Sequence, residues 1–372
     1  MHEEFIAPRY GGATLASLLP SIEASLSGTT PVLGLPRASR YVLLLVDGLG
    51  WYPLQAHADH AEMLAGHLDV ATELTCSVPS TTATSLTSLG CGVPPGQHGV
   101  VGYTFLDPAT DRLLNALTWD GGPDDIQGFR CHDTAFQRMA ARGQHSGAVS
   151  LSRFADSALT QLAFGGTEHL GVEKEGQSGH FVDLVLQSLS THQVVYCYER
   201  MLDHDGHGYG VGSWQWLDRL ARIDDMVAEL ADHLPVDTCL LVTGDHGMVN
   251  VPTHRKIVAD DETALAGCRH IGGEARFRQL YCDNPRRVAA SWSEFMGDRA
   301  HVLTRDEALA AGWFGLDVDP RVVPRIGDVL VAMRADWGVM TSAFPGEFSL
   351  VGMHGSLTAE EMVVPLFAFG PQ

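Results

Sequence analysis

Three apolar segments of this chain each lead into an acidic residue that is followed closely by glycine. They are YVLLLVDGLG (41–50), QVVYCYERMLDHDG (193–206) and TCLLVTGDHG (238–247). Unbroken apolar runs are typical of strands buried on both faces of a parallel sheet. Segments with helical periodicity lie before and between the strands, near residues 11–28, 53–66, 133–142, 181–189 and 213–233. This alternation predicts an α/β fold with a doubly wound, mostly parallel sheet flanked by helices.

The segment CSVPSTTATSLTSLGCGVPPGQHG (76–99) connects an apolar strand, which starts near residue 68, to a helix. Pro79 ends the strand, residues 83–89 favour two helical turns, and Gly90 and Gly92 are expected to end them. At a helix N-terminus, free N–H groups and the helix dipole favour a bound anion. No Lys or Arg occurs in residues 41–111, so we expect a metal to balance the charge of a bound phosphate. The junction itself carries four hydroxyl residues: Ser80, Thr81, Thr82 and Thr84.

Residues 251–340 differ in character, because their strand-like and helix-like segments lack the Asp-Gly ends of the first three strands. We expect residues 256–340 to form a smaller inserted α+β subdomain that caps the sheet edge. Residues 1–255 and 341–372 would form the catalytic core. Within this scheme the segment GDVLVAMRADWGVM (327–340) is expected to return to the core, which VGMHGSLTAEEMVVPLFAFGP (351–371) completes.

Composition narrows the classes of partner. The 372 residues include 45% hydrophobic and 19% charged residues, and the formal net charge is −21. Such an acidic chain argues against a nucleic-acid or anionic-membrane surface and favours a small-molecule partner. No signal-peptide pattern and no apolar run of about 20 residues is visible. The seven cysteines are scattered, without a C-x-x-C pair, which indicates reduced thiols and a cytoplasmic location.

Metal-ligand residue types lie at four predicted strand ends, each close to glycine. In an open α/β sheet such residues converge at the carboxyl edge, where ligands bind. Carboxylate and imidazole in two sets fit two borderline divalent ions, most simply Zn²⁺. The hydroxyl of Thr82 would be the nucleophile. A free hydroxyl is too weak a nucleophile, and coordination to a metal would remove its proton. The candidate ligands are Asp47, Asp203 with His207, Asp245 with His246, and His354.

Alternatives remain open from the residues alone. Asp205 competes with Asp203, because D-H-D-G-H offers two carboxylates. Thr82 also suits a helix cap, a role that Ser and Thr often fill. Ser80 and Thr81 are the neighbouring hydroxyls that compete with it.

Five segments resemble, in order, the motifs of the nucleotide pyrophosphatase/phosphodiesterase (type I phosphodiesterase) family of the alkaline phosphatase superfamily. They are VDGLG (46–50), VPSTTATSLTSLGCGVPPGQHG (78–99), DHDGHGYG (203–210), GDHGM (244–248) and GMHGSLTAEEM (352–362). The family's pattern F-P-T-x-T-f-P-N leads to T-G-x-x-P-x-x-H-G without gaps and places Thr82 as the nucleophile. The resemblance covers about residues 40–255 and 340–372 and implies an alkaline phosphatase-like core.

The resemblance also implies a role for each candidate residue. One zinc would be held by Asp47, Asp245 and His246, with Thr82 reaching it. The other zinc would be held by Asp203, His207 and His354, since the family's D-x-x-G-H spacing selects Asp203. Two positions depart from the family pattern: Thr84-Ser85 replaces Pro-Asn, and Tyr103 stands where a phosphate-binding Asn is expected. Tyr103 is therefore the candidate substrate-binding residue, as a hydroxyl donor.

The implied activity is that of a metal-dependent phosphodiesterase or nucleotide pyrophosphatase that acts through a phospho-threonine intermediate. The alternatives are a phosphomonoesterase or phosphonate (C–P) hydrolase of the same superfamily, and a degenerate homologue that binds metal without turnover. A sulfatase is rejected, because Cys76-Ser-Val-Pro does not match C/S-x-P-x-R. If a further cation contacts the phosphoryl group, Arg276 and Arg278 of the inserted subdomain are its candidate sources.

Overall fold

A seven-stranded sheet forms the centre of the computed structural model, which describes residues 5–260 and 266–370. Its strand order is β2-β17-β8-β1-β7-β5-β6. The pairs β8–β1, β1–β7, β7–β5 and β5–β6 are parallel, whereas β17 is antiparallel to both β8 and β2. The strands are β1 (Arg40–Val46), β2 (Thr72–Thr75), β5 (Ser146–Leu151), β6 (Glu168–Val172), β7 (Val194–Glu199), β8 (Thr238–Gly244) and β17 (Val363–Phe369). The predicted α/β class with a mostly parallel sheet is confirmed.

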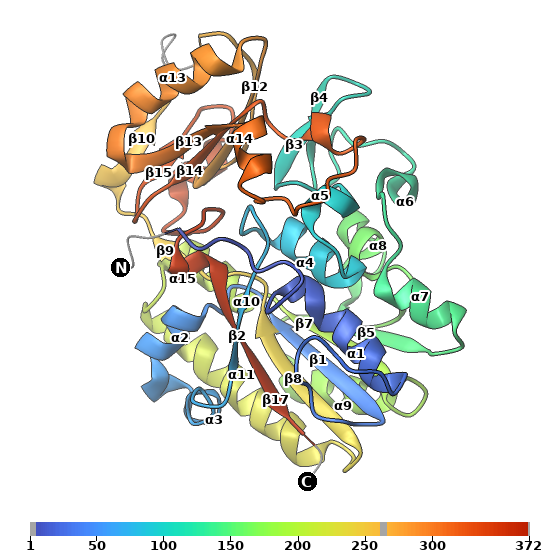
Figure 1. Cartoon of the computed structure of the whole chain (residues 1–372). Coiled ribbons are helices and arrows are strands. Elements are labelled where there is room, and N and C mark those ends of the chain that lie inside the picture. Colours follow the sequence, from blue (N-terminus) through green and yellow to red (C-terminus); the bar gives the residue numbers. More distant parts are fainter. Residues whose placement is uncertain (1–4, 261–265, 371–372) are drawn as a thin grey trace.

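Helices cover both faces of this sheet, as Figure 1 shows. Alternate residues of β1 divide between two hydrophobic cores: Tyr41, Leu43 and Leu45 pack with one set of helices, and residues 42, 44 and 46 with the other. This explains why the strand is apolar at every position. The first core involves α1 (Leu18–Leu26), α4 (Thr82–Cys91), α7 (Ala135–Ala141) and α8 (Ala158–Phe164). The second involves α2 (Trp51–Ala56), α3 (Glu62–Ala65), α9 (Ser178–Ser188) and α11 (Trp214–His233).

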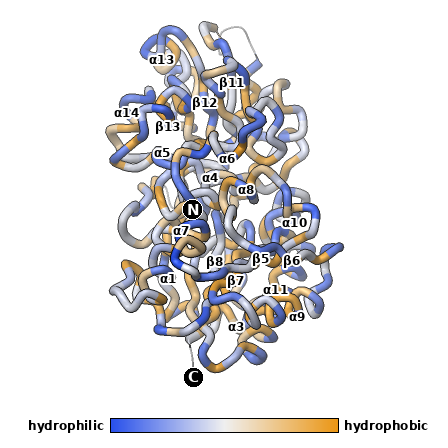
Figure 2. Tube along the Cα trace, turned by 90° about the vertical axis from the view of Figure 1, so that its right-hand side faces the viewer, coloured by the Kyte–Doolittle hydropathy of each residue, from blue (hydrophilic) through white to orange (hydrophobic). Residues whose placement is uncertain are grey.

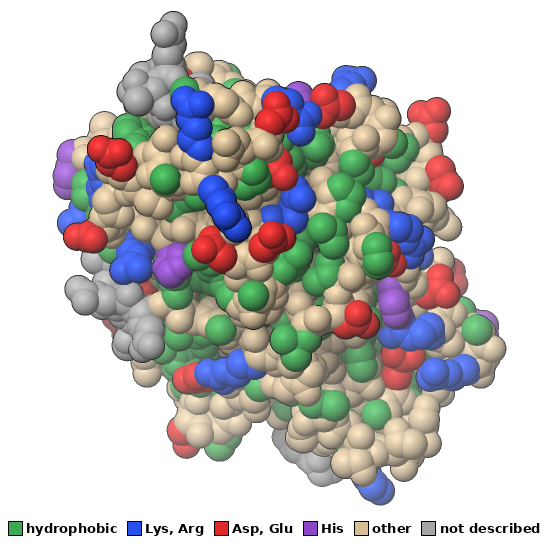
Figure 3. Space-filling model, turned by 45° about the horizontal axis from the view of Figure 1, so that its top comes forward, with side chains coloured by type: hydrophobic (Ala, Val, Ile, Leu, Met, Phe, Trp, Pro, Cys, Tyr) green, Lys and Arg blue, Asp and Glu red, His purple; other side chains and the backbone are tan. Residues whose placement is uncertain are grey.

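A smaller antiparallel sheet, of order β11-β12-β14-β13, lies above the carboxyl edge of the large one (Figures 1 and 2). Its strands are β11 (Cys268–Glu274), β12 (Phe277–Cys282), β13 (Ala300–Thr304) and β14 (Val329–Met333). Helix α13 (Pro285–Met296) contributes Val288, Trp292 and Met296 to the core of this sheet, and α14 (Arg305–Ala310) follows β13. Figure 3 shows acidic and basic side chains interspersed over this end of the molecule.

The expectation that residues 327–340 return to the large sheet is wrong. Strand β14 pairs with β12 and β13 in the small sheet, and β15 (Gly338–Met340) pairs with β10 (Lys256–Val258). The apolar run of β14 is explained by burial within the small sheet, where all five residues are buried. An apolar run therefore identified a strand but not the sheet to which it belongs.

Two helix predictions need correction. Residues 53–66 do not form one helix, since α2 and α3 are separated by a 3₁₀ turn at Ala58–His60. Gly90 does not end the helix of the 76–99 segment but lies within α4, where a Cβ would come within 1.7 Å of the carbonyl oxygen of Ala163. Gly92 ends the helix with a φ of 72°, which favours glycine.

The remaining elements are short and lie mostly near the carboxyl edge of the large sheet. They are β3 (Thr104–Asp107), β4 (Arg112–Asn115), β9 (Val249–Asn250), β16 (Gly352–Met353), α5 (Pro95–His98), α6 (Ile126–Phe129), α10 (Met201–Tyr209) and α15 (Ala359–Met362). All seven cysteines are free thiols. Among the described residues, no helix is both long and apolar enough to span a bilayer.

Candidate active site

The candidate residues of the first set meet at the carboxyl edge of the large sheet. Asp47 directly follows β1, while Asp245 and His246 directly follow β8, which is the neighbour of β1. Thr82 is the first residue of α4, and Thr81 precedes it as the N-cap. Parallel neighbouring strands end side by side, so their following residues are brought together by the sheet itself.

The second set is positioned differently from the prediction. Asp203 and His207 do not follow a strand directly but lie one turn apart on α10. His354 follows β16, which pairs with β9 in a separate two-stranded sheet. The spacing of four residues places Asp203 and His207 on the same face of α10. A helix and a small two-stranded sheet therefore supply the ligands that two ends of the large sheet's strands were expected to supply.

His246 Nε2 is the centre of the first set. It lies 3.2 Å from Thr82 Oγ1, 3.4 Å from Asp47 Oδ1 and 3.5 Å from Asp245 Oδ2. Asp47, Asp245 and His246 are all buried and form a group of the size that holds a metal ion. These three residues are the ones that the family resemblance assigned to one zinc.

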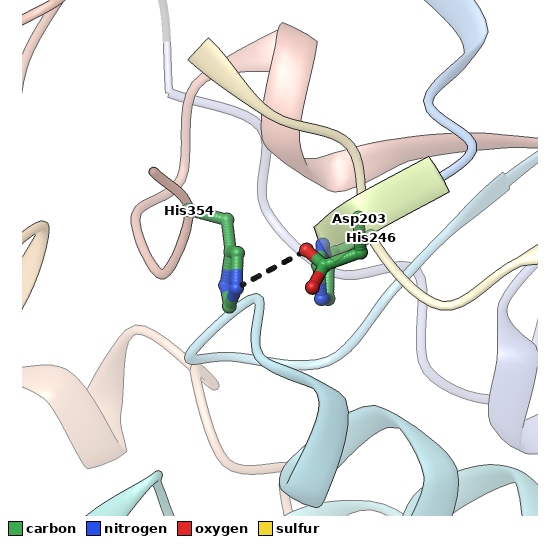
Figure 4. A group of neighbouring side chains, drawn as sticks. All are labelled: Asp203, His246 and His354. Carbon is green, nitrogen blue, oxygen red and sulfur yellow. Dashed lines mark ion pairs between the residues drawn. The ribbon is translucent and has the colours of Figure 1, made fainter. Parts of the chain in front are cut away.

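Asp203 Oδ1 is the centre of the second set. It lies 3.4 Å from His207 Nε2 and 3.8 Å from His354 Nε2. The ring of His354 also stacks on that of His246, with centroids 3.8 Å apart. Asp203, His354 and His246 form the second group of metal-ligand size, and Figure 4 shows their side chains converging. The two sets are thus adjacent, and His246 lies between them.

Three carboxylate oxygens at this point are buried without a hydrogen-bond partner: Asp47 Oδ1, Asp203 Oδ1 and Asp245 Oδ2. Each is the oxygen that faces an imidazole Nε2. Buried polar atoms normally have partners, and unpartnered ones require an explanation. Oxygen and nitrogen ligands converging in this way fit divalent cations such as zinc.

The three imidazole rings are oriented for ligation through Nε2. The Nδ1 atoms of His207, His246 and His354 lie 2.8, 3.0 and 2.9 Å from the carbonyl oxygens of Gly352, Gly247 and Ser80, respectively. A carbonyl only accepts, so each Nδ1 carries the proton and donates it. In a neutral ring this leaves Nε2 with a lone pair directed into the site. Backbone contacts of this kind fix the tautomer of metal-ligating histidines.

Burial shifts the pKa values of aspartate and histidine side chains at this site so that their uncharged forms are favoured. Burial raises the pKa of Asp47 well above its ordinary value, and the carboxylates of Asp245 and Asp203 raise it further. Burial also raises the pKa of Asp245. Burial, followed by the nearby His246 and His207, lowers the pKa of His354 well below its ordinary value. Without cations the site is therefore electrostatically unfavourable, because carboxylates crowd together out of water.

In chelator, Asp47→Asn is expected to unfold at higher urea than wild type, by a margin that grows with pH. The folded pKa of Asp47 is raised, so above the unfolded value of about 4 the folded state holds more protons and loses stability as pH rises. Asn does not titrate, so the variant does not lose stability in this way as the pH rises. Urea unfolding of both proteins in chelator between about pH 4 and 8 measures the margin. A margin that stays constant with pH would contradict this account.

The hydroxyl and carboxylate alternatives occupy other places. Asp205 is paired with Arg219 at 3.0 Å rather than facing the imidazole Nε2 atoms. The Ser80 hydroxyl donates to the carbonyl of Ser356 at 2.6 Å. The geometry therefore brings Thr82 and Asp203 into the cluster, and not Ser80 or Asp205.

Two cavities meet at Thr82 and Asp203. The first, of about 550 Å³, extends toward the small sheet and the 343–350 loop. The second, of about 450 Å³, is lined by residues of β5, β6, β7 and α8. Tyr103, the candidate substrate-binding residue, lines the first cavity, with Thr81, Thr82, Leu117, Asp203, His207, Glu274, Ala275, Ala343, Phe344, Pro345, Gly346, Glu347, Leu350, Met353 and His354.

Sequence reasoning missed several residues at the site. The Tyr198 hydroxyl donates to Asp47 Oδ2, and Arg153 and Arg200 line the second cavity. Glu274 of β11 reaches His354, with its Oε2 3.4 Å from Nδ1. None of these lies in a recognisable motif. One signal for Tyr198 was available in the sequence. Tyr196 and Tyr198 are two residues apart in the apolar strand β7, so their side chains lie on the same face of the sheet.

The proposed cation sources Arg276 and Arg278 are already paired. Arg276 binds both carboxylate oxygens of Glu361, at 2.9 and 2.6 Å, and both side chains are fully buried. Arg278 forms a buried pair with Glu347. Neither guanidinium lines the cavities at Thr82. The suggestion that they contact the phosphoryl group is therefore contradicted by their ion pairs.

The family model described as "Type I phosphodiesterase / nucleotide pyrophosphatase" matches residues 41–357. One curated relative is GPI ethanolamine phosphate transferase 3 of Eremothecium gossypii, 34% identical over 53 residues. That match spans 14% of this chain and 5% of the relative's length.

Solved structures share the fold over most of the chain. Murine ectonucleotide pyrophosphatase / phosphodiesterase 5 has 16% identity and a TM-score of 0.68, covering 89% of this chain and 88% of its own. An inactive variant of the murine protein in complex with AMP has 16% identity and a TM-score of 0.69, covering 90% and 88%. Phosphonoacetate hydrolase from Sinorhizobium meliloti 1021, in complex with phosphonoacetate, has 18% identity and a TM-score of 0.69, covering 90% and 91%.

Proposed function

Because this chain belongs to the type I phosphodiesterase / nucleotide pyrophosphatase family, we propose that it hydrolyses phosphodiester or phosphoanhydride bonds with Thr82 as nucleophile. The observation that carries this proposal is the position of Thr82 Oγ1. It lies at the N-terminus of α4, 3.2 Å from His246 Nε2 and beside carboxylate oxygens that lack partners. A hydroxyl at a helix N-terminus next to such a cluster fits phosphoryl transfer.

The two sets of ligands fit two divalent cations, which we take to be zinc. Asp47, Asp245 and His246 would hold one, and Asp203, His207 and His354 the other. Such ions would supply charge neutralisation for the phosphoryl group and for the attacking and leaving oxygens. Supporting observations are the three unpartnered carboxylate oxygens and the three Nε2 lone pairs described above.

The chain's own residues then carry out the transfer. Thr82 Oγ1 gives up its proton to solvent and forms the bond to phosphorus, while the bond from phosphorus to the opposite ester oxygen breaks and that oxygen takes a proton from solvent. N–H groups in the first turn of α4 have no partner within the helix and are available to phosphoryl oxygens. Attack of water on the resulting phospho-threonine releases the phosphorylated product and restores Thr82.

Diesters are expected to be better substrates than monoesters. Two cavities open from Thr82, so a phosphorus atom bound there has room for two substituents. A monoester places an additional negative charge on the phosphoryl group. Arg276 and Arg278 are not available to balance that charge, since each is engaged by a glutamate. Arg153 and Arg200, which line the second cavity, are both paired with Glu175. The measurement is kcat/KM for bis-p-nitrophenyl phosphate divided by kcat/KM for p-nitrophenyl phosphate, at neutral to alkaline pH.

A ratio above one supports the diesterase proposal, and a ratio well below one would instead favour a phosphomonoesterase. Turnover of neither ester, with hydrolysis of a phosphonate instead, would favour a C–P hydrolase. Metal binding without any turnover across diesters, monoesters and phosphonates would identify a degenerate homologue. The named complexes of the similar structures, with AMP and phosphonoacetate, suggest small phosphate-bearing ligands for this panel.

A further inference from the structure

Each carboxylate of the first ligand set has one oxygen that the protein itself binds and one that has no partner. Asp245 Oδ1 accepts from the backbone N–H groups of Gly48 and His246, at 3.1 and 3.0 Å, while Oδ2 is unpartnered. Asp47 Oδ2 accepts from the Tyr198 hydroxyl, while Oδ1 is unpartnered. The unpartnered oxygens of Asp47 and Asp245 face His246 Nε2 at 3.4 and 3.5 Å. The set therefore offers a cation one oxygen from each aspartate.

The donors that occupy the second oxygens are of two kinds. Asp245 is held by backbone N–H groups, which side-chain substitutions leave in place. Asp47 is held by a phenolic hydroxyl, which has a single proton to donate and directs it at Oδ2. The hydroxyl of Tyr198 can therefore be removed by one substitution that leaves the carboxylate of Asp47 intact.

The register of the sheet explains why Tyr198 reaches Asp47. Strands β1 and β7 are parallel, with Leu45 opposite Tyr198, and the Asp47 N–H continues the pairing by donating to the carbonyl of Glu199 at 2.8 Å. Tyr196 and Tyr198 both pack with the core that contains Leu45, because alternate residues of a strand share a face. Tyr198 is the one nearer the carboxyl edge, whereas the buried hydroxyl of Tyr196 has no hydrogen-bond partner.

The ring and the hydroxyl of Tyr198 have separate roles. The ring packs near Phe154, with centroids 6.0 Å apart, and a phenylalanine would keep this contact. The hydroxyl contributes to the ligand set, because a hydrogen bond to the outer oxygen of a ligating carboxylate fixes its orientation. With Oδ2 occupied, Asp47 has only Oδ1 to offer a cation.

We propose that Tyr198 is a positioning residue that restricts Asp47 to a single ligand oxygen and so favours zinc over ions that take both oxygens of a carboxylate. Zinc is bound by about four ligand atoms, whereas calcium takes about six to eight oxygens and accepts a carboxylate through one oxygen or both. The first set offers four atoms: Asp47 Oδ1, Asp245 Oδ2, His246 Nε2 and Thr82 Oγ1. This inference rests on the proposed function, because it requires the first set to hold a divalent cation.

The first test is zinc binding to the apoprotein, measured by competition with a chromogenic chelator that gives two stepwise dissociation constants. Tyr198→Phe should weaken zinc binding at one step by about tenfold or more and leave the other step close to wild type. Tyr196→Phe is the matched control, since it removes an unpartnered hydroxyl from the same face of the same strand and should leave both constants unchanged. Wild-type zinc affinity at both steps in Tyr198→Phe overturns the proposal.

Calcium binding distinguishes the restriction of Asp47 from a general loss of structure. Removing the Tyr198 hydroxyl frees Oδ2, which calcium is able to use. The calcium dissociation constant divided by the zinc dissociation constant should therefore fall by about tenfold or more in Tyr198→Phe. Calorimetry with each ion measures the two constants. Loss of affinity for both ions in equal proportion would assign Tyr198 a packing role and overturn the proposal.

A double-mutant cycle tests whether Tyr198 acts through Asp47. Asp47→Ala removes the carboxylate that the hydroxyl holds, so adding Tyr198→Phe to Asp47→Ala should change zinc affinity little. The same tenfold effect of Tyr198→Phe with and without the Asp47 carboxylate would show that the hydroxyl acts elsewhere and overturn the proposal.

These binding measurements separate the inference from the proposed activity. If wild type binds two zinc ions but hydrolyses no ester, the proposed activity fails, and weaker zinc binding by Tyr198→Phe still supports the inference. If wild type hydrolyses diesters and Tyr198→Phe binds zinc as wild type does, the inference fails and the proposed activity stands. Wild-type protein that binds no zinc overturns the inference as well.

Discussion

Thr82→Ala is expected to lower kcat for a p-nitrophenyl diester by about a thousandfold or more, with metal content unchanged. The substitution removes the only hydroxyl of the α4 N-terminus that contacts His246 Nε2, and with it the oxygen that would bond to phosphorus. Losing a covalent nucleophile removes a step that water does not replace efficiently. The proposed ligand carboxylates and imidazoles are untouched. Steady-state kinetics and elemental analysis of the same preparation check both parts.

Three matched variants control this result. Thr82→Ser keeps the hydroxyl and should retain a measurable fraction of activity. Ser80→Ala and Thr81→Ala should remain far more active than Thr82→Ala, since the Ser80 hydroxyl is bonded to Ser356 and it is the Thr82 hydroxyl that contacts His246 Nε2. A nearly wild-type Thr82→Ala protein beside an inactive Ser80 or Thr81 variant would show that the nucleophile is misassigned.

Asp245→Ala is expected to abolish most activity because it removes a carboxylate from the first ligand set. Asp245 is fully buried, its Oδ1 accepts from the Gly48 N–H at 3.1 Å, and its other oxygen faces His246. The variant therefore loses a proposed ligand and one acceptor for the β1–α2 turn. His354→Ala should have a comparable effect through the second set. Activity and thermal unfolding, each measured with and without added zinc, separate lost catalysis from lost stability.

If Asp245→Ala keeps wild-type activity, the first ligand set is wrong. If activity is lost but returns with excess zinc, Asp245 contributes to metal affinity and other ligands suffice for chemistry. Unfolding of the variant in both conditions would instead indicate that the Gly48 contact is needed for folding.

The large sheet and the first ligand set were predictable because both depend on local sequence. A continuous apolar strand needs two covered faces, and β1 provides alternate residues to two cores. Parallel pairing of β1 with β8 then brings Asp47 next to Asp245 without any information beyond the strands. The same reasoning placed a hydroxyl at a helix N-terminus, whereas the family resemblance selected Thr82 over Ser80 and Thr81.

What was missed depends on long-range packing. The apolar run of β14 was assigned to the wrong sheet, because burial in one sheet resembles burial in another. Arg276 and Arg278 were expected in the active site, but their glutamate partners are 85 and 69 residues away along the chain. Glu274 and Tyr198 approach the ligands only after the small sheet and β7 have been placed. Contacts between residues so far apart along the chain cannot be predicted from a short sequence motif.

The metal content of wild type and Asp245→Ala, measured together with their activities, tests the central claim most directly. The account predicts two divalent metals per chain in active wild-type protein, loss of both activity and metal with chelator, and fewer metals in the variant. The two groups that converge on His246 and on Asp203 are the reason for this number. Active wild-type protein with one metal or none per chain would contradict the account.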